Sequence, residues 1–194
     1  MFSLVNVSKK YRNHIVFEDV NLNFEEGNLY ILQGENGSGK TTLLKLISGI
    51  IYKTSGKVSL GNRISFLPDK FSFPKLMRVD KYLKEIFKDK KLVNSLLDKY
   101  KIPCKKILEL SKGNTLKLGI LQIMENDSDI YLLDEPLDGL DDFSKHLLKD
   151  MIKEKLNDKK IIILSVHNKS FFNDIKNIVL EFKEGKINAK KKKN

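Results

Sequence analysis

The sequence lacks the features that mark secreted and membrane-spanning proteins. Its single cysteine, Cys104, excludes an internal disulfide and is typical of a reducing compartment. A membrane-spanning helix needs about 20 consecutive apolar residues, and no run in the chain approaches that length. The first residues also lack the basic start and the apolar core of a signal peptide. We therefore expect the protein to stay in the cytoplasm.

Acidic residues are scarce relative to basic ones. The 194 residues include 36 Lys and Arg against 25 Asp and Glu, which gives a formal net charge of +11. Such an excess suits a nucleic acid, an anionic membrane surface or another anionic ligand, without choosing among them. A genome that favours Lys, Asn and Ile would produce the same excess, and this interpretation is equally open.

A glycine-rich stretch, Gly34-x-x-x-x-Gly39-Lys40-Thr41, matches the phosphate-binding loop pattern G-x-x-x-x-G-K-[ST]. It follows an apolar strand predicted at 28–33 and precedes a helix predicted at 42–48, as this loop requires. The glycines let backbone N–H groups point at phosphate oxygens, Lys40 can reach the β- and γ-phosphates, and the Thr41 hydroxyl can ligate Mg²⁺. The expected nucleotide contacts here are Gly34, Glu35, Asn36, Gly37, Ser38, Gly39, Lys40, Thr41 and Thr42. The sequence therefore predicts a nucleoside triphosphate site rather than a plain connecting turn.

Two adjacent carboxylates, Asp134 and Glu135, follow an apolar strand predicted at 129–133. Ligands of open α/β sheets bind at the carboxyl ends of parallel strands. Asp134 can hold the Mg²⁺ that bridges the phosphates, and Glu135 can act as general base toward the attacking water. Such a pair alone is more often a solvated strand end, but beside a phosphate loop we interpret it as catalytic.

The remaining pattern alternates between strands and helices. Further strands are expected at 2–7, 15–24, 57–60, 63–67, 160–166 and 177–182, the last within a closing hairpin. Three helical patterns between 79 and 124 are interpreted as an inserted helical subdomain at about 72–125, and another helix is expected at 145–156. Alternation around a phosphate loop predicts a single α/β domain with a mostly parallel sheet, followed by a solvated tail at 190–193.

The order of the motifs resembles the ATP-binding cassette (ABC) ATPase domain over essentially the whole chain. The phosphate loop and the strand before Asp134 are shared with many ATPases, so the resemblance depends on the stretches around them. Leu110-Ser-Lys-Gly-Asn114 resembles the signature motif LSGGQ, and Leu137-Asp-Gly-Leu-Asp141 resembles the D-loop. His167 matches the switch histidine, and Tyr11 is similar to the A-loop aromatic that stacks on adenine.

The resemblance implies a P-loop NTPase core with an N-terminal antiparallel β subdomain and a small inserted α-helical subdomain. It also implies an ATPase that uses ATP and Mg²⁺ and works as a head-to-tail pair of cassettes, either a homodimer or a heterodimer with a related subunit. Ser111 and Gly113 would then contact the γ-phosphate held by the partner's phosphate loop, while Asp141 belongs to the D-loop. Three simpler roles stay open: a helix cap for Ser111, a surface histidine for His167 and a packing aromatic for Tyr11.

Two departures from the family pattern stand out. Lys112 and Asn114 replace the common Gly and Gln of the signature, as in the LSKG variants of some small bacterial exporters. Asp69 stands where the Q-loop of the family usually has a Gln that touches Mg²⁺ and couples to the transmembrane subunit. Asp69 could approach the same metal, so the expected metal contacts are Thr41, Asp134 and Asp69.

Two hypotheses for the biological role follow. In the favoured one, the chain is the separate ATPase subunit of an ABC transporter. It docks on a transmembrane permease subunit at the inner face of the cell membrane, and the signature and the short helical insert lean toward a small exporter. In the other, it is a non-transport ABC ATPase that acts on nucleic acid or in a cytoplasmic assembly complex. We expect no direct membrane span and consider nucleic acid the weaker alternative.

Overall fold

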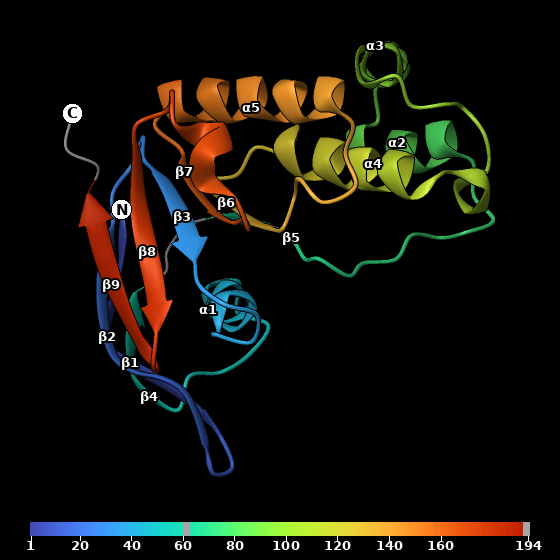
Figure 1. Ribbon diagram of the computed structural model, residues 1–194. Helices are drawn as coiled ribbons and strands as arrows, with labels where there is room; N and C mark the ends of the chain where they lie inside the picture. The colour runs from blue at the N-terminus through green and yellow to red at the C-terminus, as the bar shows by residue number, and fades with distance from the viewer. Residues whose placement is uncertain (60–62, 192–194) are drawn as a thin grey trace.

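A six-stranded sheet forms the centre of the structure, a computed structural model that describes residues 1–59 and 63–191 (Figure 1). Its strands are β3 (Leu29–Gln33), β5 (Ile64–Leu67), β6 (Ile130–Asp134), β7 (Ile161–Ser165), β8 (Asn177–Lys183) and β9 (Lys186–Lys191). They follow the order β5-β6-β7-β3-β8-β9. The first five of these strands run parallel to one another, and β9 pairs antiparallel with β8 in a hairpin.

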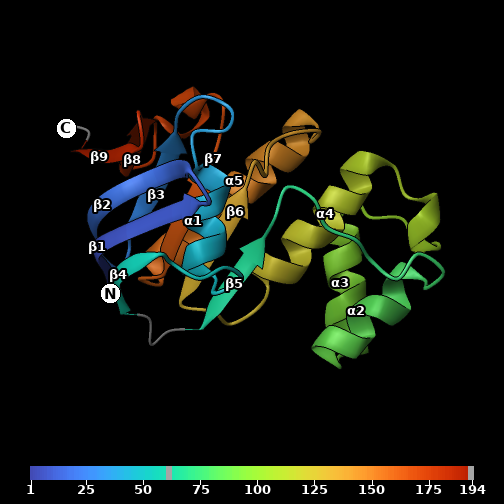
Figure 2. The same cartoon turned by 90° about the horizontal axis from the view of Figure 1, so that it is seen from below.

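A second, three-stranded sheet is built from the beginning of the chain. It consists of β1 (Phe2–Tyr11), β2 (His14–Phe24) and β4 (Ser55–Ser59) in the antiparallel order β2-β1-β4. The rings of Phe2 and Phe24 stack at 4.4 Å between their centroids and anchor the β1–β2 pair. Figure 2 shows this sheet arching over the helix α1 (Lys40–Ile47).

The apolar residues of β3 contribute buried side chains to both faces of the central sheet. Successive side chains of a strand point to opposite faces, so Leu29 and Ile31 join one buried cluster while Tyr30 and Leu32 join another. The second cluster packs against α1 and the antiparallel sheet, and the first packs against α5 (Asp142–Asn157) and the helices near it (Figure 1). A strand covered on both faces needs a continuous apolar sequence, which β3, β6 and β7 all have.

Three helices fill the stretch between β5 and β6: α2 (Val79–Phe87), α3 (Lys90–Tyr100) and α4 (Lys112–Met124). Figure 2 shows them gathered to one side of the sheet. Val79 and Leu83 of α2 belong to the same buried cluster as sheet residues such as Leu133. Because one apolar core joins the helices to the sheet, the separate helical subdomain at about 72–125 stays a prediction.

Several predicted boundaries differ from the structure. β1 continues through polar residues to Tyr11, because its pairing with β2 extends the strand beyond the apolar pattern. α1 begins at Lys40, and α5 begins at Asp142, earlier than the patterns indicated. Two short 3-10 helices, η1 (Ile107–Glu109) and η2 (Lys169–Phe172), were not predicted.

The predicted tail at 190–193 is wrong in its first half, because β9 pairs with β8 up to Lys191. Residues 192 and 193, and the predicted strand end at residue 60, lie outside the described residues. In the part of the chain that the structure describes, no helix is both long and apolar enough to cross a membrane.

Candidate active site

Four parallel strands bring the predicted site residues to one edge of the central sheet. β3, β5, β6 and β7 lie next to one another in parallel pairs, so their carboxyl ends meet at the same edge. The phosphate loop follows β3, Asp69 follows β5, Asp134 ends β6 with Glu135 next to it, and His167 follows β7. Strand pairing alone therefore brings together residues as far apart in the sequence as Gly34 and His167.

The phosphate loop leaves the start of α1 open. Gly39 is the N-cap of α1 with φ 106°, a left-handed conformation that favours glycine, and a Cβ there would come within 2.7 Å of Val16 Cγ1. In the described structure no side chain caps this helix, and its first turn carries no carboxylate. The N–H groups and the positive end of the helix dipole are therefore available to an anion.

Lys40 is held inside the loop. Its side chain is buried, and Nζ donates hydrogen bonds to the carbonyl oxygens of Gly34 at 2.8 Å and Glu35 at 2.9 Å. Within the described residues, Ser38 Oγ is buried and lacks a hydrogen-bond partner. A buried ammonium next to an unsatisfied hydroxyl is a favourable place for phosphate oxygens, which accept hydrogen bonds from both.

A hollow of about 720 Å³ lies over this loop, within the size range of ligand pockets. Its lining residues are His14, Ile15, Val16, Gln33, Gly34, Glu35, Asn36, Gly37, Ser38, His167, Glu181, Phe182, Lys183, Glu184 and Gly185. Tyr11 is not in that set: its half-exposed ring lies beneath Lys9 Nζ, 4.4 Å from the ring centroid. Stacking of Tyr11 on adenine stays a prediction. The start of β2 and the β8–β9 turn supply the wall instead, and no motif in their sequences predicted this.

Asp134 is 2% exposed at the end of β6. Its Oδ1 accepts a hydrogen bond from Ser165 Oγ at 2.6 Å, while its Oδ2 is buried and has no partner among the described residues. A buried carboxylate oxygen without a partner is costly, and a bound cation would satisfy it. The structure therefore suits the predicted metal role of Asp134.

Ser165 is a site residue that the sequence reasoning missed. Its Oγ donates to Asp134 and accepts a hydrogen bond from the Glu135 N–H at 2.9 Å. One hydroxyl thus binds the Asp134 carboxylate and the backbone of Glu135. The available signal was a single polar residue at the end of the otherwise apolar strand β7, which pairs with β6 at Asp134.

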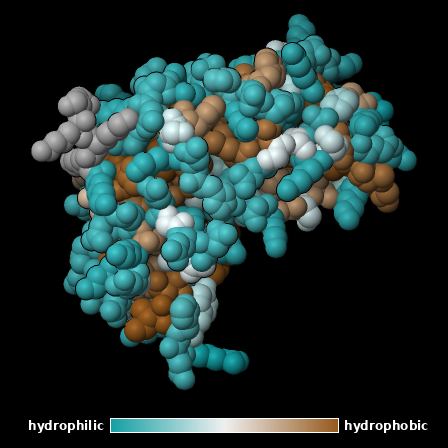
Figure 3. Space-filling view, viewed as in Figure 1, coloured by the Kyte–Doolittle hydropathy of each residue, from teal (hydrophilic) through white to brown (hydrophobic). Residues whose placement is uncertain are grey.

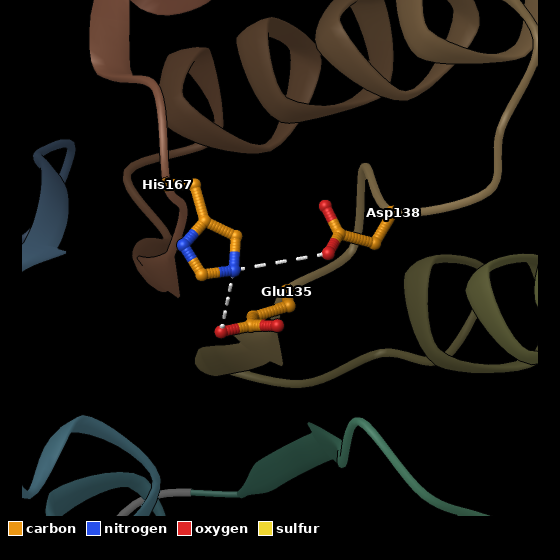
Figure 4. A group of neighbouring side chains, drawn as sticks. All are labelled: Glu135, Asp138 and His167. Carbon is orange, nitrogen blue, oxygen red and sulfur yellow. Dashed lines mark ion pairs between the residues drawn. The ribbon is translucent and has the colours of Figure 1, made fainter. Parts of the chain in front are cut away.

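Glu135, the predicted general base, and His167, the predicted switch histidine, lie next to each other. His167 Nε2 is 3.2 Å from Glu135 Oε1 and 3.9 Å from Asp138 Oδ2 (Figure 4). Glu135 has φ 50°, an unusual conformation for a residue with a side chain, and its N–H bond to Ser165 holds it there. The backbone thereby aims the Glu135 carboxylate toward the imidazole.

Asp69 and the signature stretch share a second hollow with these acids. This space of about 400 Å³ is lined by Asp69, Lys70, Phe71, Leu110, Lys112, Thr115, Leu116, Asp134, Glu135 and Asp138. The structure therefore brings Asp69 near the predicted metal residue Asp134, although Thr41 is not in this lining. A metal contact from Asp69 or Thr41 stays a prediction.

Ser111 is the N-cap of α4, and its Oγ accepts a hydrogen bond from the Asn114 N–H at 3.2 Å. The simpler role considered for Ser111 is thus present, and it does not exclude the predicted contact with a partner's nucleotide. A Cβ at Gly113 would come within 3.0 Å of the Gly139 carbonyl oxygen, so the start of α4 packs closely on the loop after β6. Both signature residues lie outside the lining of the hollow over the phosphate loop.

Asp141 caps α5 and ties it to the signature helix. Its Oδ1 accepts hydrogen bonds from the Ser144 N–H and Oγ, and its Oδ2 lies 3.0 Å from Lys117 Nζ of α4. The hydrogen bonds from Ser144 and then Lys117 hold the pKa of the Asp141 carboxyl well below its ordinary value. The predicted D-loop residue therefore has a structural role within its own chain.

A phosphate loop between a central strand and a helix, with an acid-ended strand on the same sheet edge, defines a P-loop nucleoside triphosphatase. Residues 17–138 match the family model described as "ABC transporter". Among curated relatives, the cytochrome c biogenesis ATP-binding export protein CcmA of Reclinomonas americana is 31% identical, with 84% of this chain and 82% of the relative covered. The zinc import ATP-binding protein ZnuC of Rickettsia conorii is 33% identical, with 78% and 70% covered.

A solved structure from Pyrococcus furiosus, a putative ABC transporter ATP-binding protein, superposes with a TM-score of 0.79. It is 27% identical, with 93% of this chain and 96% of that chain covered. The chain belongs to the ABC transporter family. It is the ATP-binding subunit, an ATPase whose ATP hydrolysis is coupled to transport. The predicted α/β fold with an N-terminal antiparallel sheet and a mostly parallel sheet is confirmed.

Proposed function

We propose that this subunit binds MgATP on residues 34–41 and hydrolyses it with Glu135 as general base, and that a second cassette completes the site. The observation that carries the proposal is the meeting of the phosphate loop, Asp134, Glu135 and His167 at one sheet edge. Lys40 and the open start of α1 would bind the phosphates, with Thr42 and the loop glycines close to them.

Asp134 would hold Mg²⁺, because its buried Oδ2 lacks a partner within the described residues. When bound, the ion would neutralise charge on the β- and γ-phosphates. The Thr41 hydroxyl and Asp69 are the further ligands proposed. Ser165 would keep Asp134 oriented by its bond to Oδ1, which leaves Oδ2 free for the metal.

Glu135 would take a proton from the water that attacks the γ-phosphate. Its carboxylate is only partly exposed, and its backbone is held by Ser165, so its position is set before the nucleotide arrives. His167 would hold the Glu135 carboxylate from one side at 3.2 Å and reach the γ-phosphate from the other. This arrangement positions a base and a hydrogen-bonding group without further rearrangement of the strands.

A second cassette, in a homodimer or a heterodimer with a related subunit, would supply Ser111 and Gly113 to the bound ATP. Both residues lie away from the hollow over the phosphate loop of their own chain, yet they begin a helix whose dipole favours anions. ATP would then be the ligand that drives the two chains together.

The permease subunit would dock on the helical end of the molecule. Leu76 is 78% exposed and Leu108 52% exposed, and the Leu108 N–H bonds to the Lys75 carbonyl oxygen, so these two leucines lie on paired segments. Figure 3 shows apolar surface at this end. Basic residues outnumber acidic ones by about two to one between Asp69 and Lys112, which suits the anionic inner leaflet of the cell membrane.

Export is the direction we propose, on the basis of Lys112 in the signature and the short helical insert. Relatives named for export and for import match the chain about equally, so the direction rests on the sequence pattern. Docking on a permease is tested by coexpression with a polytopic membrane protein encoded in a neighbouring reading frame. The two chains should copurify from detergent-solubilised membranes. Loss of copurification in a Leu76→Asp/Leu108→Asp double variant, but not in a Leu92→Asp control, would support the proposed docking surface. Recovery with nucleic acid and no membrane protein would favour the non-transport alternative.

A further inference from the structure

Three metal-binding side chains converge beside the phosphate loop: Glu135, Asp138 and His167. We propose that in the nucleotide-free chain these three residues form a site for a divalent transition metal, Zn²⁺ above all, and that an ion bound there stops ATP hydrolysis. The site would be separate from the Mg²⁺ site proposed at Asp134, which is buried and does not belong to this group.

The distances suit a small cation. His167 Nε2 lies 3.2 Å from Glu135 Oε1 and 3.9 Å from Asp138 Oδ2, and one ligand atom from each residue lies within 4.8 Å of the others. A tetrahedral Zn²⁺ with bonds of about 2.0–2.2 Å separates its ligand atoms by about 3.4 Å. Figure 4 shows the three side chains pointing toward one another, so small rotations would close the remaining gap.

The backbone holds these ligands in place. Glu135 and Asp138 come from one tight turn, in which the Asp138 N–H donates to the Glu135 carbonyl oxygen at 3.2 Å. The Glu135 N–H is bound to Ser165 Oγ, and His167 follows Ser165 by two residues. Ser165 therefore ties together the two segments that carry the ligands, and little ordering is left for the metal to impose.

The chemistry of the three groups selects a transition metal over Mg²⁺. Imidazole nitrogen suits Zn²⁺, whereas Mg²⁺ prefers oxygen ligands in octahedral geometry and gives up its water reluctantly. Side chains of His167 and Asp138 are 50% and 56% exposed, so an ion can enter from solvent. Three protein ligands leave a fourth position for water.

The effect on catalysis follows from which atoms the metal would occupy. A metal bound to Glu135 takes the carboxylate lone pairs that a general base needs, and it removes Nε2 of His167 from the γ-phosphate. This inhibitory effect rests on the role proposed above for Glu135. Metal binding itself depends only on the geometry of the three side chains.

Binding is tested on the full chain without nucleotide or Mg²⁺. Zn²⁺ affinity is measured by calorimetry, and Co²⁺ serves as a spectroscopic probe because its visible absorption reports coordination by nitrogen and oxygen ligands. The test variants are Asp138→Asn and His167→Gln, which keep the size of each side chain. Their controls are Asp142→Asn, a more exposed acid close by, and His146→Gln, a histidine outside the group.

We expect one Zn²⁺ per chain, at least tenfold weaker binding in each test variant, and unchanged binding in both controls. Circular dichroism and thermal unfolding of all four variants check that the fold is kept. Equal Zn²⁺ affinity in the unchanged chain and the test variants, or equal losses in the controls, would overturn the proposal.

Turnover is then measured with saturating MgATP and the free Zn²⁺ concentration fixed by a metal buffer. For each protein we compare the fraction of its own turnover that Zn²⁺ inhibits, not the absolute rate. Half-inhibition of Asp138→Asn should need at least tenfold more Zn²⁺ than half-inhibition of the unchanged chain. Tight Zn²⁺ binding with undiminished turnover would support the site and overturn the inhibitory effect, whereas the role of Glu135 as base is tested independently by the turnover of Glu135→Gln. The two proposals can therefore fail separately.

Discussion

Two helices of this molecule begin in different ways, one without a side-chain cap and one with a cap. α1 starts at Gly39 without a side-chain cap, whereas α4 starts at Ser111, whose hydroxyl already accepts the Asn114 N–H. Both helix ends attract anions through the helix dipole, but in the described structure only α4 of the two has one of its first N–H groups satisfied by a side chain. The start of α1 is open to a nucleotide, whereas Ser111 at the start of α4 serves its own helix as a cap and still has its O–H to donate to a partner's nucleotide.

Removing the positive charge at the uncapped start of α1 tests this end of the site most directly, because it affects both ATP binding and turnover. Lys40→Ala should weaken ATP binding and turnover by roughly a hundredfold or more, because it deletes the only ammonium held in the loop. Calorimetry with ATP measures this, and Lys45→Ala, at the other end of the same helix, is the control. An unchanged ATP affinity in a folded Lys40→Ala protein would contradict the assignment of residues 34–41.

A substitution at Glu135 should separate ATP hydrolysis from ATP binding. Glu135→Gln should lower turnover by roughly 10²–10⁴-fold and leave ATP affinity unchanged, because the amide keeps the shape but cannot take a proton. Steady-state phosphate release and ATP titration of the same preparation give both numbers. Near-normal turnover in this variant would show that another group accepts the proton.

A negative charge placed at Ser111, the capped start of α4, tests the signature half of the site. In the Glu135→Gln background, ATP should drive dimerisation, and Ser111→Glu should prevent it by placing a carboxylate against the partner's γ-phosphate. ATP binding by the monomer should stay the same. Sedimentation at saturating ATP makes the measurement, with Ser95→Glu on the exposed face of α3 as the control. If Glu135→Gln stays a monomer with bound ATP, the start of α1 in one chain does not meet the start of α4 in another across a dimer.

The smallest expected effect concerns Asp141, which ties α5 to the capped helix α4. Because hydrogen bonds from Ser144 and Lys117 lower the pKa of Asp141 from its ordinary value of 3.8, its contribution to stability is present above that value. The contribution is lost as the pH falls through the lower, folded pKa. Asp141→Asn should therefore be slightly destabilised at neutral pH, and its difference from the unchanged chain should shrink below about pH 3.8.

Urea unfolding from neutral pH down to the acid limit of the folded state checks this. The control is Asp142→Asn, which removes an exposed acid from the same turn. A constant difference between Asp141→Asn and the unchanged chain across the acid range would contradict the assignment.

Local motifs made much of the site predictable. The phosphate loop acts through consecutive residues, so its glycines, Lys40 and the following helix could be identified from their spacing. Asp134 and Glu135 could be placed at a sheet edge because an apolar strand precedes them. Element boundaries were less accurate: the apolar pattern does not reveal how far β1 extends along β2, and α1 starts at the motif lysine itself.

The sequence by itself determined the class of protein, because phosphate binding is a property of one continuous stretch of backbone. Only the tertiary structure showed that Ser165 binds the Asp134 carboxylate and the backbone of Glu135, and that Asp138 lies 3.9 Å from His167. It also showed that the start of β2 and the β8–β9 turn, and not Tyr11, line the hollow over the loop. These contacts join segments about 30 or more residues apart, and the pairing of β6 with β7 and of β3 with β8 decides them. No local pattern encodes which strand will be a neighbour, so these residues became visible only in the folded chain.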